Sequence, residues 1–501
     1  MDTETLVLDE ETARDRAEEL LCILHRDRSA PGGLLDCDRY IRGEHDDPYM
    51  PKDATAEYRL LAKRCVTNLV PLVIGTPAQG LYADGVRSGD PDSDENPPEW
   101  DAWQRSGMDK RQGSVYRGAF GYGHSFVLSE YEDESRTKAR MRVLSPLRTA
   151  VGYDDPANDD APIAAIYVKR WPRTVKKGNS QEEREGEARY WDEVDEWSVR
   201  FKSLSDITSI TKVGPHGNSE CPVERFAPFV DLDGRTRGLV APIIPLQNRI
   251  NQTVFDLLIA QTFGSFKVRY ATGMEPSYVL DPETGEPKLD DNGHPIEKPV
   301  RAHLSRFMMA ESPDTKFGEL NETSLSGYIE AIDMGIRHLA AIEQIPPHHL
   351  LGQIANLSAE ALNAAETALM RKIEEFQHSF GESWERTFRL IGELEGNQAQ
   401  ASDYHAEVVW RDMGAQSLAQ TSDALGKLSE MLGVPKRGLW RRVPGVTQRE
   451  LEEWTDLLEQ EPDRALAAGN VRALGPRETP AEPEGEEDLI PPQPSTQEGA
   501  A

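Results

Sequence analysis

The stretch QIPPHHLLGQIANL, residues 344–357, lies between two long runs of helical periodicity. It contains no Asp, Glu, Lys or Arg, although the 501-residue chain has a formal net charge of -31 and 29% charged residues. The adjacent prolines Pro346 and Pro347 argue against a continuous helix through the stretch. We therefore interpret residues 344–357 as a flexible, uncharged loop between two helices, suited to touching a polyanion without binding it strongly.

Helices are expected on both sides of this loop. Before it, residues 245–263 and 324–344 carry apolar side chains at steps of three and four, which predicts two amphipathic helices. After it, Ser358 is a candidate N-cap. The apolar spacing that follows continues to Ile391 and predicts one helix about 50 Å long. Residues 264–320 show short strand patterns and Gly-containing turns, which predict hairpins.

The rest of the chain is expected to be a mixed α+β region. Helical spacing is found at residues 10–26, 54–72, 415–432 and 447–458. Strand patterns bounded by turn residues are found at 124–129, 140–144, 162–169, 188–191 and 197–201, with a charged hairpin tip or loop at 174–187. Residues 404–411 could return as a strand to the same sheet. From residue 461 the hydrophobic content falls, which predicts a disordered acidic tail.

Composition excludes several classes of protein. The acidic charge leaves no broad positive surface for tight nucleic-acid binding. Cys22, Cys37, Cys65 and Cys221 have no CxxC spacing and follow an acidic N-terminus, so we expect reduced thiols in a cytosolic product. No apolar run is long enough to cross a membrane. The motifs of P-loop ATPases, serine hydrolases and zinc proteases are missing from the sequence, and we expect no enzyme activity and no cofactor.

Two clusters of polar residues deserve an alternative interpretation. His348 and His349 could bind metal or DNA, but adjacent side chains point in different directions and no carboxylate is near in sequence. We therefore expect an exposed loop pair and assign no metal site. A metal-dependent nuclease could use the acidic cluster Asp154, Asp155, Asp159 and Asp160. Pro156 and Asn158 lie within that cluster, which favours a solvated turn.

Four passages resemble portal proteins of tailed double-stranded DNA bacteriophages, in the branch common among phages of actinobacteria. They are RYIRGEHDDPYMPKDATAEYRLLAKRCVTN (39–68), AFGYGHSFVLS (119–129), IIPLQNRINQTVFDLLIAQTFGSFKVRY (243–270) and IANLSAEALNAAETALMRKIEEFQHSFGESWE (354–385). The resemblance extends from about Asp38 to Trp454, and the order of the passages carries it. Another head-completion or scaffold-like protein is the alternative, with the nuclease less favoured.

The resemblance implies a portal architecture of named parts. They are a wing (1–237), a first stem helix (238–263), a β-rich clip (264–322), a second stem helix (323–343), a tunnel loop (344–357), a long helix returning to the wing (358–413), short crown helices (414–460) and the acidic tail (461–501). It also implies a homo-oligomeric ring, usually of twelve subunits, at one capsid vertex. Double-stranded DNA would pass through this ring during packaging and ejection.

Partners and channel residues follow from the same resemblance. The expected partners are the large terminase subunit, the head-tail adaptor or connector, and the major capsid and scaffold proteins, with assembly in the host cytoplasm and residence in the virion. The tunnel-loop residues expected near DNA are Gln344, His348, His349, Gln353 and Asn356. The candidates for facing the channel are Arg249, Lys267, Arg301, Arg306, Glu330, Asp333 and Arg337. On the second stem helix, Glu330, Asp333 and Arg337 carry charges of both signs and would leave no strong net attraction for phosphate. Arg249, Lys267, Arg301 and Arg306 would supply the positive potential of the lower channel.

Overall fold

The computed structural model describes residues 9–89, 99–159, 161–177, 180–264, 269–272, 278–279, 281–282, 284–290, 293–296, 316–319, 324–352, 359–411, 418–443, 446 and 448–459. The chain divides into two compact units, Met1–Ala415 and Gln416–Ala501. Helices and antiparallel strands both contribute to the first unit, so the mixed α+β class expected from the sequence is confirmed.

A five-stranded antiparallel sheet forms one layer of the first unit, with strand order β10-β9-β8-β5-β4. The strands are β4 (Thr149–Gly152), β5 (Ala164–Arg170), β8 (Gly186–Trp191), β9 (Asp195–Ser203) and β10 (Asp206–Pro215). Helix α1 (Glu10–Ser29) packs on this sheet. Its buried face, which includes Leu20, Leu21 and Leu24, shares a core with Ile166, Tyr190 and other sheet residues.

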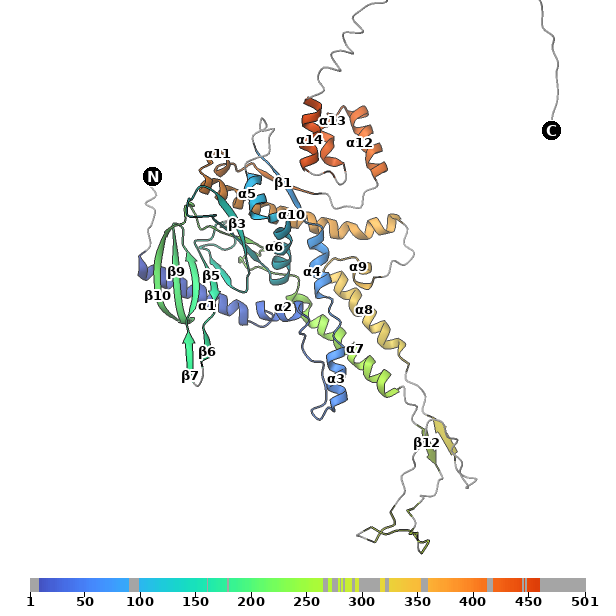
Figure 1. Cartoon of the computed structure of the whole chain (residues 1–501). Helices are drawn as coiled ribbons and strands as arrows, with labels where there is room; N and C mark the ends of the chain where they lie inside the picture. The colour runs from blue at the N-terminus through green and yellow to red at the C-terminus, as the bar shows by residue number, and fades with distance from the viewer. Residues whose placement is uncertain are drawn as a thin grey trace, which may run out of the picture. The chain divides into compact units, whose positions relative to one another are not determined.

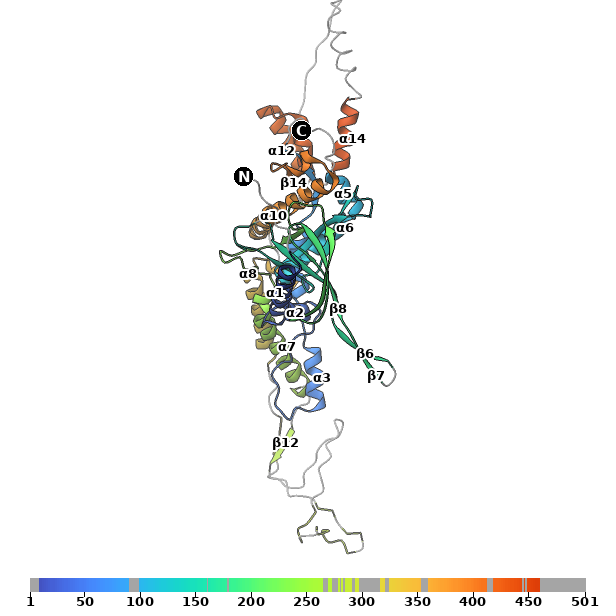
Figure 2. The ribbon, with the colours of Figure 1, turned by 90° about the vertical axis from the view of Figure 1, so that its left-hand side faces the viewer.

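The charged segment at 174–187 forms a hairpin of β6 (Arg173–Lys177) and β7 (Ser180–Arg184). This hairpin extends away from the five-stranded sheet (Figure 2). A second sheet has the order β11-β2-β3, with β2 (Ser125–Tyr131), β3 (Ala139–Leu144) and β11 (Val223–Phe226). Strands β4, β10 and β11 were not expected from the sequence.

The central element of the first unit is α10 (Ala359–Glu395), a helix of 37 residues. Phe376, Phe380, Trp384 and Phe388 recur every fourth position and are at most 3% exposed. They contact aromatic residues of α5 (Glu99–Ser106), α6 (Met108–Tyr122) and β11. The long helix expected from the sequence is therefore confirmed, and its neighbours explain how it remains ordered along its length.

The two sequence patterns correspond to helices α7 (Ile244–Gly264) and α8 (Ser326–Ile342), as predicted. The two helices lie side by side (Figure 1). They approach closely at Gly335, where an added Cβ would lie 2.9 Å from Ile250 Cγ1. In the intervening segment, β12 (Arg269–Thr272) pairs with β13 (Lys316–Glu319), and an isolated bridge joins Leu289 to Pro295. Most of the remaining residues between 264 and 323 lie outside the described part of the chain.

The single helix expected over 54–72 is wrong, because the structure contains α3 (Ala56–Arg64) and α4 (Val70–Gln79) with a break between them. Side chains of α7 form hydrogen bonds with the backbone N–H and C=O groups at the break. Gln247 accepts a hydrogen bond from Leu69 N at 3.2 Å and donates to Thr67 O at 2.8 Å. Asn251 accepts from Thr67 N. These tertiary hydrogen bonds outweigh the local helical spacing. Helix α2 (Leu34–Ile41) precedes this region.

The strand expected at 404–411 is present as β14 (Glu407–Trp410), but its partner differs from the expected one. It pairs with β1 (Ala83–Arg87) in a separate two-stranded sheet rather than with the five-stranded sheet. The short helix α11 (Gln398–Ala401) links α10 to this strand. Strand β1 was not expected, because its pairing depends on residues more than 300 positions later in the chain.

The second unit contains α12 (Leu418–Leu432), α13 (Lys436–Leu439), the 3-10 turn η2 (Trp440–Arg442) and α14 (Gln448–Glu459). Trp440 and Trp454 contact each other edge to face at 5.8 Å. The predicted acidic tail at 461–501 lies outside the described residues. Among the described helices, none combines the length and apolar character that a bilayer span requires. No disulfide joins the four cysteines; Cys22 is exposed, and Cys37, Cys65 and Cys221 are buried.

Candidate functional site

The stretch that opens the predicted loop begins with a tight turn at the end of α8. Gln344 has φ 54°, in the left-handed region where glycine is usual. Gln344 N donates to Ala341 O and Ile345 N donates to Ala340 O at 2.9 Å. This Schellman-type pattern satisfies the last carbonyls of the helix and redirects the chain sharply. It therefore determines where the following residues begin.

The next residues form a short helix and not a flexible loop, so that part of the expectation is wrong. Helix α9 (Pro347–Leu351) begins after the N-cap Pro346 and ends at Gly352, whose φ is 65°. Ile345 and Leu350 are 3% and 7% exposed and belong to the main core. Burying two aliphatic side chains contributes roughly 1.5–3 kcal/mol each. Residues 344–352 are thus anchored, while Gln353 and Asn356 lie outside the described residues.

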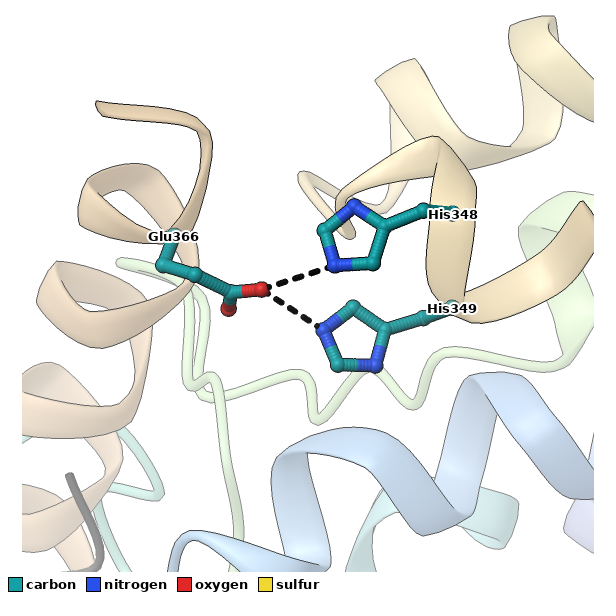
Figure 3. A group of neighbouring side chains, drawn as sticks. All are labelled: His348, His349 and Glu366. Carbon is teal, nitrogen blue, oxygen red and sulfur yellow. Dashed lines mark hydrogen bonds and ion pairs between the residues drawn. The ribbon is translucent and has the colours of Figure 1, made fainter. Parts of the chain in front are cut away.

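His348 and His349 face the same carboxylate, contrary to the expected divergence, and only His349 is exposed as expected. Their ring centroids are 4.5 Å apart, and their Nε2 atoms lie 3.0 and 2.9 Å from the same Glu366 oxygen (Figure 3). The His348 side chain is 13% exposed, the Glu366 side chain 30% and the His349 side chain 36%. Glu366 is distant in sequence, and the start of α10 brings it back over α9, which sequence spacing could not reveal.

A buried ion pair fastens the end of α8 to α10. Lys372 Nζ lies 2.7 Å from the main-chain oxygen of Glu343 and 3.2 Å from its Oε2. The two side chains are only 7% and 3% exposed. Burial raises the pKa of Glu343 and lowers the pKa of Lys372, and the attraction between the two groups opposes both shifts. The ion pair holds the residue immediately before Gln344.

The candidate channel residues on α7 and α8 lie at the surface of the single chain. Arg249 and Arg337 are exposed, as is Glu330, and Asp333 is partly exposed. Arg337 Nε donates to Asp333 Oδ2 at 2.7 Å within α8. Arg249 contacts His338 Nδ1 at 3.2 Å across the two helices. Opposite charges on α8 therefore pair locally. Lys267, Arg301 and Arg306 lie outside the described residues.

The acidic cluster at 154–160 folds as the solvated turn that the sequence favoured. Asp155 accepts hydrogen bonds from Ala157 N and Asn158 Nδ2, and its own N–H donates to Asp159 Oδ2 at 2.7 Å. Asp160 lies outside the described residues. Within the described part of the chain, the group of three potential metal-ligating side chains is instead His348, His349 and Glu366.

Comparison with known proteins finds two similar portal proteins. The portal protein of Mycobacterium phage D29 is 26% identical over 403 residues, and that of Mycobacterium phage L5 is 25% identical over 402 residues. Each match covers 76% of this chain and 76% of the relative. Among solved structures, the neck of a native GTA particle computed with C12 symmetry matches with a TM-score of 0.42 at 12% identity, covering 81% of this chain and 97% of that chain. The neck of an empty GTA particle computed with C6 symmetry matches with a TM-score of 0.40 at 13% identity, covering 78% and 94%.

The family model described as phage portal protein, SPP1 Gp6-like, matches residues 23–463. This range includes all the helices and sheets described above except residues 10–22 of α1. The chain therefore belongs to the SPP1 Gp6-like phage portal proteins, non-enzymatic structural components of the virion that provide the vertex channel for genome packaging.

Proposed function

We propose that this chain assembles into a closed ring, of twelve copies by the family resemblance, at one capsid vertex. Double-stranded DNA enters and leaves through the ring. The large terminase subunit docks on the clip during packaging, and a head-tail adaptor replaces it afterwards. Scaffold and major capsid proteins surround the wing. In this assignment α7 and α8 are the stem, residues 344–357 are the tunnel loop and α12–α14 are the crown.

The tunnel-loop assignment depends on one observation: an uncharged stretch of the chain is anchored by buried side chains. Residues 344–357 have no ionisable group other than two histidines. The buried residues Ile345 and Leu350 and the Lys372–Glu343 ion pair fix its first part. A constriction needs this combination, because a rigid rim sets the diameter while the absence of cationic side chains keeps phosphate contacts weak.

The surface of α8 fits contact with two neighbouring copies. Gly335, Ile336, Leu339 and Ala340 face the core. At about 100° per residue, Glu330 and Arg337 lie about 130–150° round the helix from the centre of that face, and Asp333 lies at its edge; these three residues form a polar strip. Ile329 and Ile342 are 58% and 56% exposed and lie on opposite sides of that strip. A ring requires two different contact surfaces on each copy, and these two side chains would provide one apolar contact on each side, with the polar strip lining the channel.

The loop assignment is tested by adding positive charge. The variant Gln353→Lys/Asn356→Lys should slow or stall DNA packaging in a terminase-driven assay, because each new cation attracts phosphate at the constriction. Ring formation, followed by negative-stain microscopy, should remain normal. The variant Gln353→Ser/Asn356→Ser is the uncharged control and should package normally. If the lysine variant packages DNA at the wild-type rate, Gln353 and Asn356 do not lie at the constriction.

The stem assignment is tested by placing charge on the two exposed flanks. Ile329→Asp and Ile342→Asp should each prevent ring formation while leaving the circular dichroism of the chain unchanged. Ser326→Asp is the matched control, since Ser326 is exposed and, at about 100° per residue, lies within the polar strip between Asp333 and Arg337. Ile336 is unsuitable because it is buried in the chain's own core, where a carboxylate would destabilise the fold itself. Rings of normal size from both flank variants would refute the stem contacts.

A further inference from the structure

We propose that His348, His349 and Glu366 bind a first-row transition metal ion of the Zn²⁺ type, which clamps α9 to α10. The proposal concerns these described residues and does not depend on the ring or on the assignment of the tunnel loop. The three ligand atoms come from two elements, lie within 4.8 Å of one another and converge on one space, as Figure 3 shows.

Two of the three separations between ligand atoms are close to those of a metal centre, and the third is within 4.8 Å. Zinc lies about 2.0–2.1 Å from imidazole nitrogen and 2.0–2.2 Å from carboxylate oxygen. Tetrahedral geometry then places neighbouring ligand atoms about 3.3 Å apart. The two observed nitrogen-to-oxygen separations of 2.9 and 3.0 Å are within a few tenths of an ångström of this value. A small outward movement of the Glu366 side chain is enough to admit the ion.

The chemistry of the cluster favours a cation between the three groups. A neutral imidazole has one N–H, so its Nε2 can either donate to Glu366 or present a lone pair towards it. In the donor tautomer both rings hydrogen-bond to Glu366. In the other tautomer two lone pairs and a carboxylate oxygen converge on one space, where a bound cation would form three bonds. Imidazole with carboxylate is a ligand set for Zn²⁺ and its neighbours rather than for Mg²⁺. The partial exposure of His349 and Glu366 leaves room for a water as the fourth ligand.

The backbone around the cluster is suited to clamping. Helix α9 has five residues, too few to be stable alone. Pro346 and Gly352 limit it on each side, and the two histidines lie in its first turns. A ligand that binds only the folded arrangement stabilises it according to its concentration relative to Kd. The metal would therefore hold α9 against the start of α10 more firmly than the two hydrogen bonds alone.

The test uses the full-length chain without a polyhistidine tag, with Zn²⁺ followed by calorimetry and Co²⁺ followed by its visible absorption. We expect saturation at one ion per chain, micromolar or tighter affinity, Co²⁺ bands typical of a four-coordinate site, and no competition from millimolar Mg²⁺. His348→Ala, His349→Ala and Glu366→Gln should each weaken Zn²⁺ binding by about tenfold or more, a loss of about 1.4 kcal/mol. His378→Ala, which removes an exposed histidine from the same helix α10, should leave binding unchanged.

Two results would overturn the proposal. One is the lack of saturable Zn²⁺ binding to the wild-type chain. The other is binding that Glu366→Gln leaves intact, because this nearly isosteric variant keeps the fold and removes only the anionic ligand. A melting temperature of Glu366→Gln measured in EDTA confirms that the variant is folded. A rise in the wild-type melting temperature with Zn²⁺, lost in Glu366→Gln, is the expected supporting result.

Discussion

Replacing Lys372 by Met should be among the most destabilising single changes near the end of α8. Lys372 donates to the main-chain oxygen and the carboxylate of Glu343, and both side chains are more than nine-tenths buried. The variant keeps an unbranched apolar side chain of similar length but leaves the Glu343 carboxylate without its partner. Breaking a buried ion pair in this way costs about 3–5 kcal/mol, because a desolvated charge remains unpaired.

A double variant distinguishes the effect of an unpaired charge on stability from the effect of lost packing. In the double variant Lys372→Met/Glu343→Gln neither charge remains, and removal of both members of a buried pair is often close to neutral. We expect the double variant to be more stable than Lys372→Met by about 2 kcal/mol. Lys427→Met is the matched control, since Lys427 forms an ion pair with Asp423 at 2.6 Å but both side chains are more than 60% exposed. That change should cost less than about 1 kcal/mol.

The assay is urea denaturation followed by tryptophan fluorescence, repeated between pH 4 and pH 7. Burial raises the folded-state pKa of Glu343, and removing Lys372 raises it further. A carboxyl with a raised pKa destabilises the fold once the pH exceeds its unfolded value of about 4.3. The loss caused by Lys372→Met should therefore grow as pH rises from 4 to 7. The reasoning is refuted if Lys372→Met costs no more than Lys427→Met, or if the double variant is the least stable of the series.

Three further outcomes are expected from β2 and its surroundings, α8 and α10. Burial lowers the pKa of His124 in the folded chain to about 4. The free energy of unfolding should therefore fall by up to about 3 kcal/mol as the pH drops from about 6.5, the unfolded pKa, towards 4. His124→Gln should flatten the stability-pH curve in this window, and an unchanged slope would contradict the shift. Gly327→Ala should stabilise α8 by about 0.5–1 kcal/mol, because nothing lies near its added Cβ. Gly335→Ala should bring no gain, because its Cβ would meet Ile250. Equal melting temperatures for the two variants would argue against the close packing of α7 and α8. Trp384→Ala should lower the free energy of unfolding by about 3–5 kcal/mol in urea denaturation, because the side chain is fully buried and donates to Tyr116 Oη at 3.0 Å; a loss below about 1 kcal/mol would place it outside the core.

Much of the secondary structure follows from local sequence patterns. The apolar spacing that ends at Ile391 predicted α10 to within a few residues of its observed end at Glu395. The patterns at 245–263 and 324–344 predicted α7 and α8. Five strands of the first unit were also predicted close to their observed positions, and the segment at 174–187, predicted as a charged hairpin tip or loop, forms a hairpin. These elements could be predicted because a helix or strand that buries one face requires a hydrophobic period that is visible within a single segment.

The polar contacts of the candidate site could not be predicted in the same way. The sequence placed His348 and His349 in an uncharged stretch but offered no reason to bring Glu366 to them, since Glu366 lies 17 positions after His349. It likewise suggested a flexible loop where Ile345 and Leu350 are buried. Two prolines break a helix, but whether the chain then remains free or packs depends on the surface it meets.

The sequence alone determined the family to which this chain belongs, the mixed α+β class and the positions of the long helices. Tertiary structure decided where helices break, which distant strands pair and which charges meet. Gln247 of α7 satisfies the backbone between α3 and α4, and β14 finds β1 across more than 300 residues. The physical reason is that hydrophobic period is a local property, whereas a buried hydrogen-bonding group must find its partner wherever the whole fold places one.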